Sequence, residues 1–409
     1  MTTSKHLLIY APVPLHQTPD GLTLEDQACN GLRLWAENFD FVTAMYPVEH
    51  GPKPPSWQSI ETVGDNLKRI DLVALPTAYR PDQFLRHYRK TRDVIREKID
   101  AADYLCFSIG GMWGDWGSVS CHQAYKKGRP YAVWTDRVES EVVRRTSHSG
   151  PFRRRLRARL EHRPMAMLER HLIRRSSLGL FHGKETYDAY APYCPEPHIV
   201  HDIHVHKSEH LQPDALSAKI KAAGNTKTPE PLNIVYTGRA SAMKGPQDWV
   251  AVLKILHEGG VAFHATWLGD GPDLADMQNA ATAAGISDHI TFAGFVRDRD
   301  VLLDHLRRAH VFLFCHKTPE SPRCLIEALI SGTPIVGYDG AFARDLISGH
   351  QGGKLVPLHD VGALAEAVKD LANTREDLAQ MIAAAAKDGA PYDDESVFEH
   401  RSEIIRQYL

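Results

Sequence analysis

Short apolar runs alternate along the chain with longer stretches in which apolar residues recur every three or four positions. The runs predict buried strands and the longer stretches predict amphipathic helices. Their alternation is typical of parallel sheets whose strands are joined by crossover helices. The predicted strands are residues 6–11, 39–45, 70–75, 104–109, 131–134, 178–181 and 198–200, then 233–236, 263–268, 290–292, 311–314, 334–337 and 354–356.

A polar stretch divides this pattern into two halves. Residues 221–233 are rich in Lys, Gly, Asn, Thr and Pro, which is the composition of a linker. We therefore predict an α/β fold with two doubly wound, Rossmann-like domains, residues 1–210 and 211–392, followed by a terminal helix in 393–409. We expect the domains to face each other across a cleft and to bind ligands at the carboxyl ends of their strands.

Composition and charge narrow the classes of protein. The net charge of −3 over 409 residues argues against a chain-wide binder of polyanions, and no nucleic-acid-binding motif is present. The six cysteines form no CxxC pair, so we expect reduced thiols in a cytosolic protein. The N-terminus lacks the features of a signal peptide, and no apolar run approaches the roughly 20 residues that span a bilayer.

The segment LNIVYTGRASAMKGPQDW has the features of an anion site. A strand ends at Tyr236, a turn follows at Gly238, and Arg239 and Lys244 flank a short loop before Pro246 opens a helix. The N–H groups at a helix N-terminus attract anions, so with both cations this loop would neutralise a diphosphate. A plain strand-to-helix loop with two solvated cations remains the alternative.

Two further loops follow the next strands. Gly269 and Gly271, in the sequence GDGP, would let backbone approach a ligand closely. The segment ITFAGFV, which ends in Phe295 and Val296, would either frame a nucleobase or belong to the core.

Two glutamates accompany a predicted helix near residue 323. We expect Ser321 to cap this helix, Pro322 to lie in its first turn, and Gly332 to end it. Glu320 and Glu327 are separated by close to two helical turns, so both can face one site. Carboxylates there can accept hydrogen bonds from sugar hydroxyls. The alternative is one capping carboxylate and one surface carboxylate.

The motifs GRASAMKG, GDGP, ITFAGFV and ESPRCLIEALISGTPIV, in this order, resemble the nucleotide-binding domain of retaining GT-B glycosyltransferases of family four, the glycosyl transferases group 1. The resemblance is strong over residues 230–375. It implies that Arg239 and Lys244 hold a donor diphosphate, that Glu320 contacts the donor sugar, and that Glu327 binds the ribose hydroxyls. It also implies that the last helix crosses back onto the N-terminal domain. The donor site that it implies consists of Gly21, Gly238, Arg239, Lys244, Gly269, Gly271, Phe295, Val296, Ser321, Arg323, Cys324, Leu325 and Glu327.

This sequence departs from the family pattern at two places. Six residues separate Glu320 from Glu327, where the family usually has seven, and Pro322 and Arg323 stand in place of the usual glycine. The loop with Gly21 offers one glycine where the family has two. The sugar end of the predicted site is therefore less regular than its phosphate end.

In the N-terminal half, the segment that matches a family histidine carries Asp136, which can bind a hydroxyl or cap a helix. The glycine-rich loop SIGGMWGDWG would bind an acceptor or simply pack. The predicted acceptor-binding residues are Gly110, Gly111, Trp113, Asp115 and Trp116. The predicted catalytic residues are Glu320, Asp136, Arg239 and Lys244.

Two other features bear on partners. The histidines His201, His204, His206 and His210 alternate on an extended segment and point different ways, so we predict no metal site. Residues 144–175 carry eleven arginines and two glutamates, with apolar residues at helical spacing. This stretch would either lie on an anionic membrane or pack on its own domain with solvated arginines.

These features together predict a retaining glycosyltransferase that moves a sugar from a UDP- or GDP-linked donor to a hydroxyl of a saccharide or lipid-linked acceptor, in surface polysaccharide or glycolipid synthesis. We expect no cofactor, no nucleic-acid partner, and a cytoplasmic location, with peripheral contact at the inner face of the membrane. The alternatives are a catalytically idle GT-B protein that binds sugar or lipid, and a nucleotide-sugar epimerase.

Overall fold

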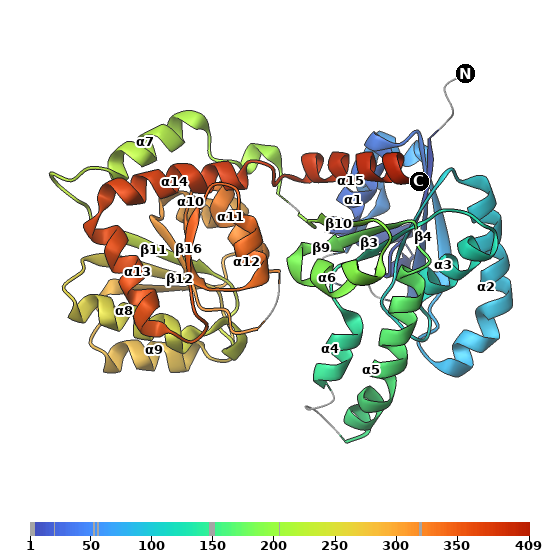
Figure 1. Cartoon of the computed structure of the whole chain (residues 1–409), viewed down its shortest axis with the longest axis horizontal. Helices are drawn as coiled ribbons and strands as arrows, with labels where there is room; N and C mark the ends of the chain where they lie inside the picture. Colours follow the sequence, from blue (N-terminus) through green and yellow to red (C-terminus); the bar gives the residue numbers. More distant parts are fainter. Residues whose placement is uncertain are drawn as a thin grey trace. The chain divides into compact units, whose positions relative to one another are not determined.

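The structure of the chain is a computed structural model that describes residues 5–19, 21–51, 54, 57–146, 152–203, 205–318 and 321–409. Contacts divide the chain into two compact units. The first unit comprises Met1–His204 together with Asp394–Leu409, and the second comprises Val205–Asp393. Both units are α/β, and each is built around its own sheet (Figure 1).

The sheet of the first unit has a parallel, doubly wound centre. Its strand order is β6-β4-β1-β7-β8-β9-β10, and the order reverses direction between β1 and β7. A hairpin and one further short strand, β2 (Leu15–Thr18), β3 (Gly21–Glu25) and β5 (Trp57–Ser59), continue the sheet beyond β4. The central strands are β1 (His6–Tyr10), β4 (Phe41–His50), β6 (Ile70–Pro76), β7 (Tyr104–Ser108), β8 (Ala132–Thr135), β9 (Leu178–His182) and β10 (Pro197–Val200).

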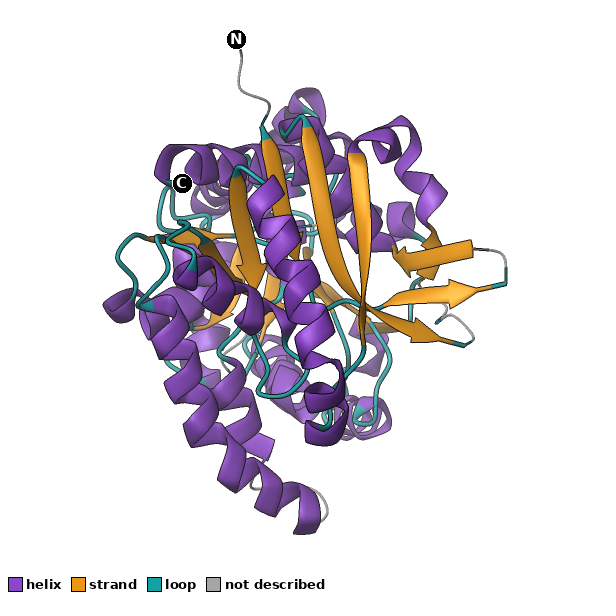
Figure 2. Ribbon diagram, turned by 90° about the vertical axis from the view of Figure 1, so that its right-hand side faces the viewer, coloured by secondary structure: helices purple, strands orange, loops and turns teal. Residues whose placement is uncertain are grey.

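Helices cover both faces of this sheet (Figure 2). The inner strands β1, β7 and β9 are therefore buried on both sides, as β1 illustrates: Leu7 and Ile9 enter one core cluster, while Leu8 and Tyr10 enter the other. The helices are α1 (Asp26–Asn38), η1 (Ile60–Arg69), α2 (Pro81–Ala101), α3 (Trp116–Lys126), α4 (Glu139–Thr146), α5 (Phe152–Ile173), α6 (Gly183–Tyr190), η2 (Ala191–Tyr193) and α15 (Asp394–Tyr408). In the described part of the chain, no helix combines the length and the apolar character that crossing a bilayer requires.

The terminal helix α15 packs on the first unit, as predicted. Its Phe398 ring lies 4.9 Å from the ring of Trp35 in α1. Its Arg401 is buried, and the guanidinium lies 5.3 Å from the ring of Trp134 in β8 and donates a hydrogen bond to the carbonyl oxygen of His201. The helix that follows the second unit in sequence therefore completes the core of the first.

The second unit has a six-stranded parallel sheet with the order β13-β12-β11-β14-β15-β16. This order reverses direction between β11 and β14. The strands are β11 (Leu232–Thr237), β12 (Phe263–Leu268), β13 (Ile290–Gly294), β14 (Val311–Phe314), β15 (Ile335–Tyr338) and β16 (Gly353–Val356). The helices are η3 (Lys207–Glu209), α7 (Pro213–Ala223), η4 (Ala242–Lys244), α8 (Pro246–Glu258), α9 (Leu274–Ala283), η5 (Ser287–His289), α10 (Arg299–Arg308), α11 (Arg323–Ile330), α12 (Ala341–Leu346), α13 (Val361–Asn373) and α14 (Arg375–Gly389).

The predicted fold of two doubly wound α/β domains is confirmed, and each predicted strand overlaps an observed one. The polar stretch 221–233, however, lies inside the second unit. Its first residues end α7 and its last residues begin β11, so it joins a helix to a strand there.

Candidate functional site

A pocket of about 970 Å³ opens in the second unit where the strand order reverses. In doubly wound sheets this switch point leaves a crevice at the carboxyl ends of the strands, because neighbouring loops diverge to opposite faces. Loops that follow β11, β12, β13 and β14 all contribute to it. The lining residues are Tyr236, Thr237, Gly238, Arg239, Lys244, Leu268, Gly269, Asp270, Gly271, Pro272, Phe295, Val296, Leu302, Pro322, Arg323, Cys324 and Glu327.

Two of these loops run side by side without space for side chains. The Gly238 N–H donates to the Leu268 carbonyl at 2.9 Å, and the Ala240 N–H donates to the Asp270 carbonyl at 3.0 Å. At Gly269, where φ is +153°, a Cβ atom would lie 1.9 Å from the Gly238 carbonyl oxygen. The glycine therefore lets the two backbones meet at the wall of the pocket.

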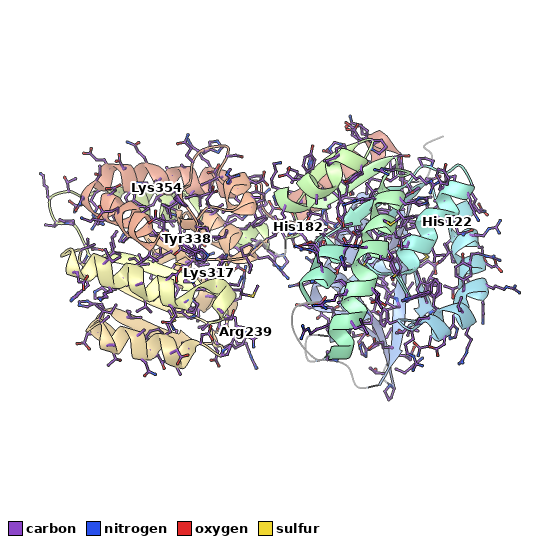
Figure 3. The ribbon with its side chains drawn as sticks, turned by 60° about the horizontal axis from the view of Figure 1, so that its bottom comes forward. His122, His182, Arg239, Lys317, Tyr338 and Lys354 are labelled. Carbon is purple, nitrogen blue, oxygen red and sulfur yellow. The ribbon has the colours of Figure 1, made fainter. Side chains whose placement is uncertain are left out.

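Positive charge gathers where the first loop enters α8. Arg239 has an exposed side chain (Figure 3), and Lys244 is partly exposed at the end of η4. Pro246 is the first residue of α8, as predicted, and no side chain caps this helix. The N–H groups of its first turn therefore remain available to an anion.

The acidic residue in the first turn of α8 is neutralised locally. Asp248 accepts hydrogen bonds from the Lys317 ammonium and the Tyr338 hydroxyl, both at 2.7 Å. Figure 3 shows these two donors close together within the second unit. The carboxylate is thus engaged by fixed donors and does not oppose anion binding at the helix N-terminus.

A buried aromatic pair lies beneath the loop after β11. The Tyr236 hydroxyl and His316 Nε2 are 2.9 Å apart, and the two rings are nearly perpendicular. Burial, and then the nearby Lys244 ammonium, lower the pKa of His316 to about 3. His316 is therefore neutral at physiological pH, and the Tyr236 hydroxyl can donate to it.

Glu327 lies on α11 with its carboxylate at the pocket, where Arg299 binds it. Arg299 also forms two hydrogen bonds with Glu209, at 3.0 and 2.9 Å. Neither Arg299 nor Glu209 was predicted from the sequence. Arg299 comes three positions after Val296. A charged residue just beyond the end of a strand was therefore the one sequence signal that could have indicated a place near the pocket. Glu209 had none, because it lies 90 positions away from Arg299.

The pocket brings together most of the predicted donor residues: Gly238, Arg239, Lys244, Gly269, Gly271, Phe295, Val296, Arg323, Cys324 and Glu327. Leu325 does not line it, because its side chain is buried in the core. The prediction that Ser321 caps the helix is wrong: α11 begins at Arg323, Pro322 occupies the cap position, and no side chain caps it. Glu320 lies outside the described residues. Gly21 belongs to the first unit, where it begins β3.

A second pocket, of about 500 Å³, lies at the switch point of the first unit's sheet. Residues after β1, β6, β7 and β8 line it, and they include the predicted Gly110, Gly111, Trp113, Asp115 and Asp136. Tyr10 and Tyr79 also line it and were not predicted. Each unit thus has a pocket at the place where its fold type positions ligands.

Two residues of the glycine-rich loop, Asp115 and Trp116, have structural roles. Asp115 caps α3, and its carboxylate accepts hydrogen bonds from the N–H groups of Gly110, Gly111, Gly117 and Ser118 and from the Ser118 hydroxyl. Its oxygens are therefore engaged within the loop rather than free for an acceptor. Trp116 is fully buried and donates its ring N–H to the Pro76 carbonyl at 2.8 Å, so it offers no platform to a sugar.

Asp136 stands directly after β8 with an exposed side chain at the first unit's pocket. Desolvation by the surrounding protein, and then repulsion by the nearby Asp202 carboxylate, raise the pKa of Asp136 to about 6. The positive charges of Arg401 and Arg137 oppose the shift. A carboxyl group with such a pKa can exchange a proton near neutral pH. Within the described residues, no group of three or more His, Cys, Asp and Glu side chains is arranged to hold a metal ion; His204 is not among the described residues.

Comparison with known proteins places this architecture. Residues 217–388 match the family described as "Glycosyl transferases group 1". A 2-deoxystreptamine N-acetyl-D-glucosaminyltransferase from Streptomyces fradiae is 29% identical over 233 residues, which are 56% of this chain and 55% of that protein. The amylovoran biosynthesis glycosyltransferase AmsK from Erwinia amylovora is 24% identical over 48% of this chain and 49% of its own length. The chain thus matches about half the length of these curated relatives.

Among solved structures, HepE from Anabaena in complex with UDP superposes with a TM-score of 0.65 at 14% identity, covering 99% of this chain and all of that one. The same protein is also known in complex with UDP-glucose. At this identity the likeness establishes the fold alone. Residues 217–388 thus match the model of the glycosyl transferases group 1 family, and the chain as a whole has the GT-B fold.

Proposed function

We propose that this protein is a retaining glycosyltransferase, which takes a sugar from a nucleotide-sugar donor bound in the second unit. The observation that carries the proposal is that Arg239, Lys244 and Glu327 line one pocket, and that α8 begins two residues after Lys244 with no side-chain cap from Gly245. This arrangement suits a ligand with a diphosphate next to a diol. The family match, and relatives whose names describe glycosyl transfer, support the same conclusion.

In the proposed reaction the leaving group is a nucleoside diphosphate. Arg239 and Lys244 would neutralise the negative charge that develops on it as the glycosidic bond breaks, and the α8 N–H groups would add fixed dipoles. Glu327 would bind the ribose hydroxyls, and Glu320 would contact the donor sugar. The acceptor hydroxyl would attack on the face that the diphosphate leaves, so the anomeric configuration is retained.

The acceptor would bind in the first unit's pocket, near Gly110, Gly111, Trp113 and Asp136. We propose a hydroxyl of a saccharide or of a lipid-linked sugar, in polysaccharide or glycolipid synthesis. The relatives are named as a 2-deoxystreptamine N-acetyl-D-glucosaminyltransferase and an amylovoran biosynthesis glycosyltransferase, which supports transfer of a sugar to such an acceptor. For the donor we propose a UDP- or GDP-linked sugar, with UDP first because HepE binds it.

The test is a thermal-shift and donor-hydrolysis screen with UDP-, GDP- and ADP-sugars on wild type and Lys244→Ala. Lys254→Ala is the matched control, because Lys254 lies on α8, pairs with Glu258 at 3.7 Å, and does not line the pocket. We expect one nucleotide to stabilise wild type and Lys254→Ala, slow release of sugar to accompany it, and Lys244→Ala to lose both. Nucleotide binding without turnover in the presence of acceptors would favour an idle binding protein. Conversion of the donor without an acceptor would favour an epimerase.

We also propose that the first unit contacts an anionic membrane at the cytoplasmic face through α5. Leu156, Leu160 and Met167 are 47, 67 and 71% exposed along this helix. Arg159, Arg163, Arg170, Arg174 and Arg175 are exposed beside them. Among the described side chains of α5, no acidic residue is exposed: Glu161 is half-buried, and Glu169 is buried and bonded to Ser140. Apolar side chains flanked by arginines suit a surface of anionic headgroups.

Co-sedimentation with vesicles tests this contact. We expect wild type to bind vesicles that contain phosphatidylglycerol and not to bind vesicles of pure phosphatidylcholine. The variant Leu160→Ser with Met167→Ser should lose most of this binding. Leu85→Ser, which changes a leucine that is 69% exposed on α2, should keep it. Equal binding by all three proteins would reject α5 as the contact.

A further inference from the structure

We propose that Arg299 is a positioning residue that holds Glu327 ready for the ribose hydroxyls, and that Glu209 in turn fixes Arg299. The inference rests on the proposed function, because it assigns to this chain's own residues the support of a nucleotide-binding carboxylate. All three residues belong to the second unit.

The geometry is that of one guanidinium between two carboxylates. Arg299 Nη1 binds Glu327 Oε1, while Arg299 Nε and Nη2 bind the two oxygens of Glu209 at 3.0 and 2.9 Å. The contact with Glu209 is a two-point fork, which fixes the plane of the guanidinium. A fixed plane leaves Nη1 aimed at Glu327.

Both ends of this arrangement are anchored in the fold. Arg299 is the first residue of α10, and the Asp298 side chain caps that helix. At the other end, Glu209 closes the short helix η3, and Arg307 donates a hydrogen bond to its backbone carbonyl at 2.7 Å. The ion triad thus links three separate helices of the second unit: η3, α10 and α11.

Charge explains why the arginine is needed. The side chains of Glu209 and Glu327 are only 15 and 17% exposed, so two carboxylates without a cation would be costly to bury. Burial alone would lower the pKa of Arg299, but hydrogen bonds and charges from Glu209 and Glu327 outweigh it and raise that pKa. The permanent cation also offsets the charge of Glu327, which would otherwise repel a diphosphate bound in the same pocket.

The arrangement gives Arg299 a role that the sequence motifs do not assign. Arg299 binds Oε1 of Glu327 and thereby fixes the direction of Oε2. We infer that Glu327 accepts hydrogen bonds from a diol only while this orientation is kept. Loss of Arg299 should therefore weaken recognition of the ribose itself, and not only the stability of the unit. This consequence separates a positioning role from a purely structural one.

The experiment measures affinity by calorimetry for UDP and GDP and for their 2′-deoxy counterparts, with thermal midpoints alongside. We expect wild type to bind one ribonucleotide about tenfold more tightly than its 2′-deoxy form, as the loss of a hydrogen bond to a charged group implies. In Arg299→Gln the ribonucleotide should lose this advantage, so that the ratio of the two affinities approaches one. Glu209→Gln should reduce the ratio partially.

Two further proteins keep the test decisive. Arg308→Gln, at the other end of α10 and paired with Asp304 on the same helix, is the control and should keep the wild-type ratio. If Arg299→Gln folds poorly, the double variant Arg299→Gln with Glu209→Gln removes one of the two uncompensated carboxylates. That variant should recover its melting point but not the ratio.

The outcomes separate the two proposals. A wild-type ratio that survives in a folded Arg299 variant would overturn the inference and leave the proposed function intact. Equal weakening of both nucleotides would also overturn it, because it would indicate a structural role. Absence of any nucleotide binding to wild type would instead refute the proposed function and the inference with it.

Discussion

A single hydrogen atom in place of a side chain at Gly269 lets two loops at the second unit's pocket run side by side. Its φ of +153° and the 1.9 Å approach of a Cβ to the Gly238 carbonyl leave no room for alanine. We expect Gly269→Ala to separate the two loops, lower the free energy of unfolding by about 1–3 kcal/mol, and abolish nucleotide binding. Urea unfolding and nucleotide titration measure both effects.

Gly285→Ala is the matched control for this variant. Gly285 also has a positive φ, of +69°, but a Cβ there would meet nothing within 4 Å. We expect a cost of about 1 kcal/mol from the backbone conformation alone and unchanged nucleotide affinity. Equal loss of binding in both alanine variants would show that global destabilisation, and not the wall of the pocket, is responsible.

Residue types alone did not distinguish ligand contacts from packing in the glycine-rich loop. Trp113 and Trp116 have similar sequence surroundings, yet Trp113 lines the pocket while Trp116 is fully buried. Asp115 is a helix cap, a role that depends on where α3 begins. The places of Gly238, Lys244 and Gly269 at the pocket were predictable, because each lies in a short loop directly after a strand that the apolar pattern had located.

At the scale of elements, the terminal helix α15 supplies core to a unit from which it is distant in sequence. Phe398 is 4% exposed and packs against Trp35, and the Arg401 guanidinium lies 5.1 Å from its ring. We expect Phe398→Ala to destabilise the first unit by about 3–5 kcal/mol, the usual cost of removing a buried aromatic ring. Calorimetry should show a lower midpoint for the first unit only.

Nucleotide affinity is the internal control for that variant. The residues that line the second unit's pocket lie between Tyr236 and Glu327, all in the second unit, so the nucleotide affinity that we propose for it should not change. A loss of nucleotide binding in Phe398→Ala would contradict the independence of the two cores.

Apolar runs predicted the inner strands because strands buried on both faces are almost wholly apolar: β14 is apolar throughout, and β1 is apolar after His6. The strands β2, β3 and β5 escaped prediction because they are short, only three to five residues long, and carry polar residues such as His16, Gln17 and Gln58. The Glu209–Arg299–Glu327 triad escaped for a different reason. It joins residues that are distant in sequence, and no local pattern encodes such a contact.

At the scale of the whole molecule, buried ionisable groups differ in kind between the two units. In the second unit, burial lowers the pKa of His310 to about 4 and of His316 to about 3. In the first unit, burial raises the pKa values of the acids Asp115 and Glu169, and the surrounding protein raises that of Asp136 to about 6. The pKa values of the first unit's partly buried His122 and exposed His171 are also lowered, but less than those of His310 and His316.

Acid should therefore act on the two units in opposite directions. A histidine whose pKa is lowered by folding takes up its proton more readily in the unfolded chain, so stability is lost as pH falls from about 6.5 towards the folded value. An acid whose pKa is raised by folding is protonated more readily in the folded chain, so lower pH favours folding through that group. Between pH 7 and 5 we expect the second unit's transition to move to lower temperature relative to the first unit's.

His316→Gln tests the assignment of this shift. The glutamine amide can still accept from the Tyr236 hydroxyl but cannot be protonated, so the variant escapes the acid penalty at this site. At pH 5 the histidine is protonated in the unfolded chain but stays neutral in the folded one. This difference lowers the free energy of unfolding by about 2 kcal/mol at pH 5 and has no effect near pH 8. Scanning calorimetry at both pH values should show the second unit's midpoint falling less on acidification in His316→Gln than in wild type. His264→Gln, which changes an exposed histidine on β12, should follow wild type. An identical acid shift in His316→Gln and wild type would mean that other groups govern the acid sensitivity of this unit.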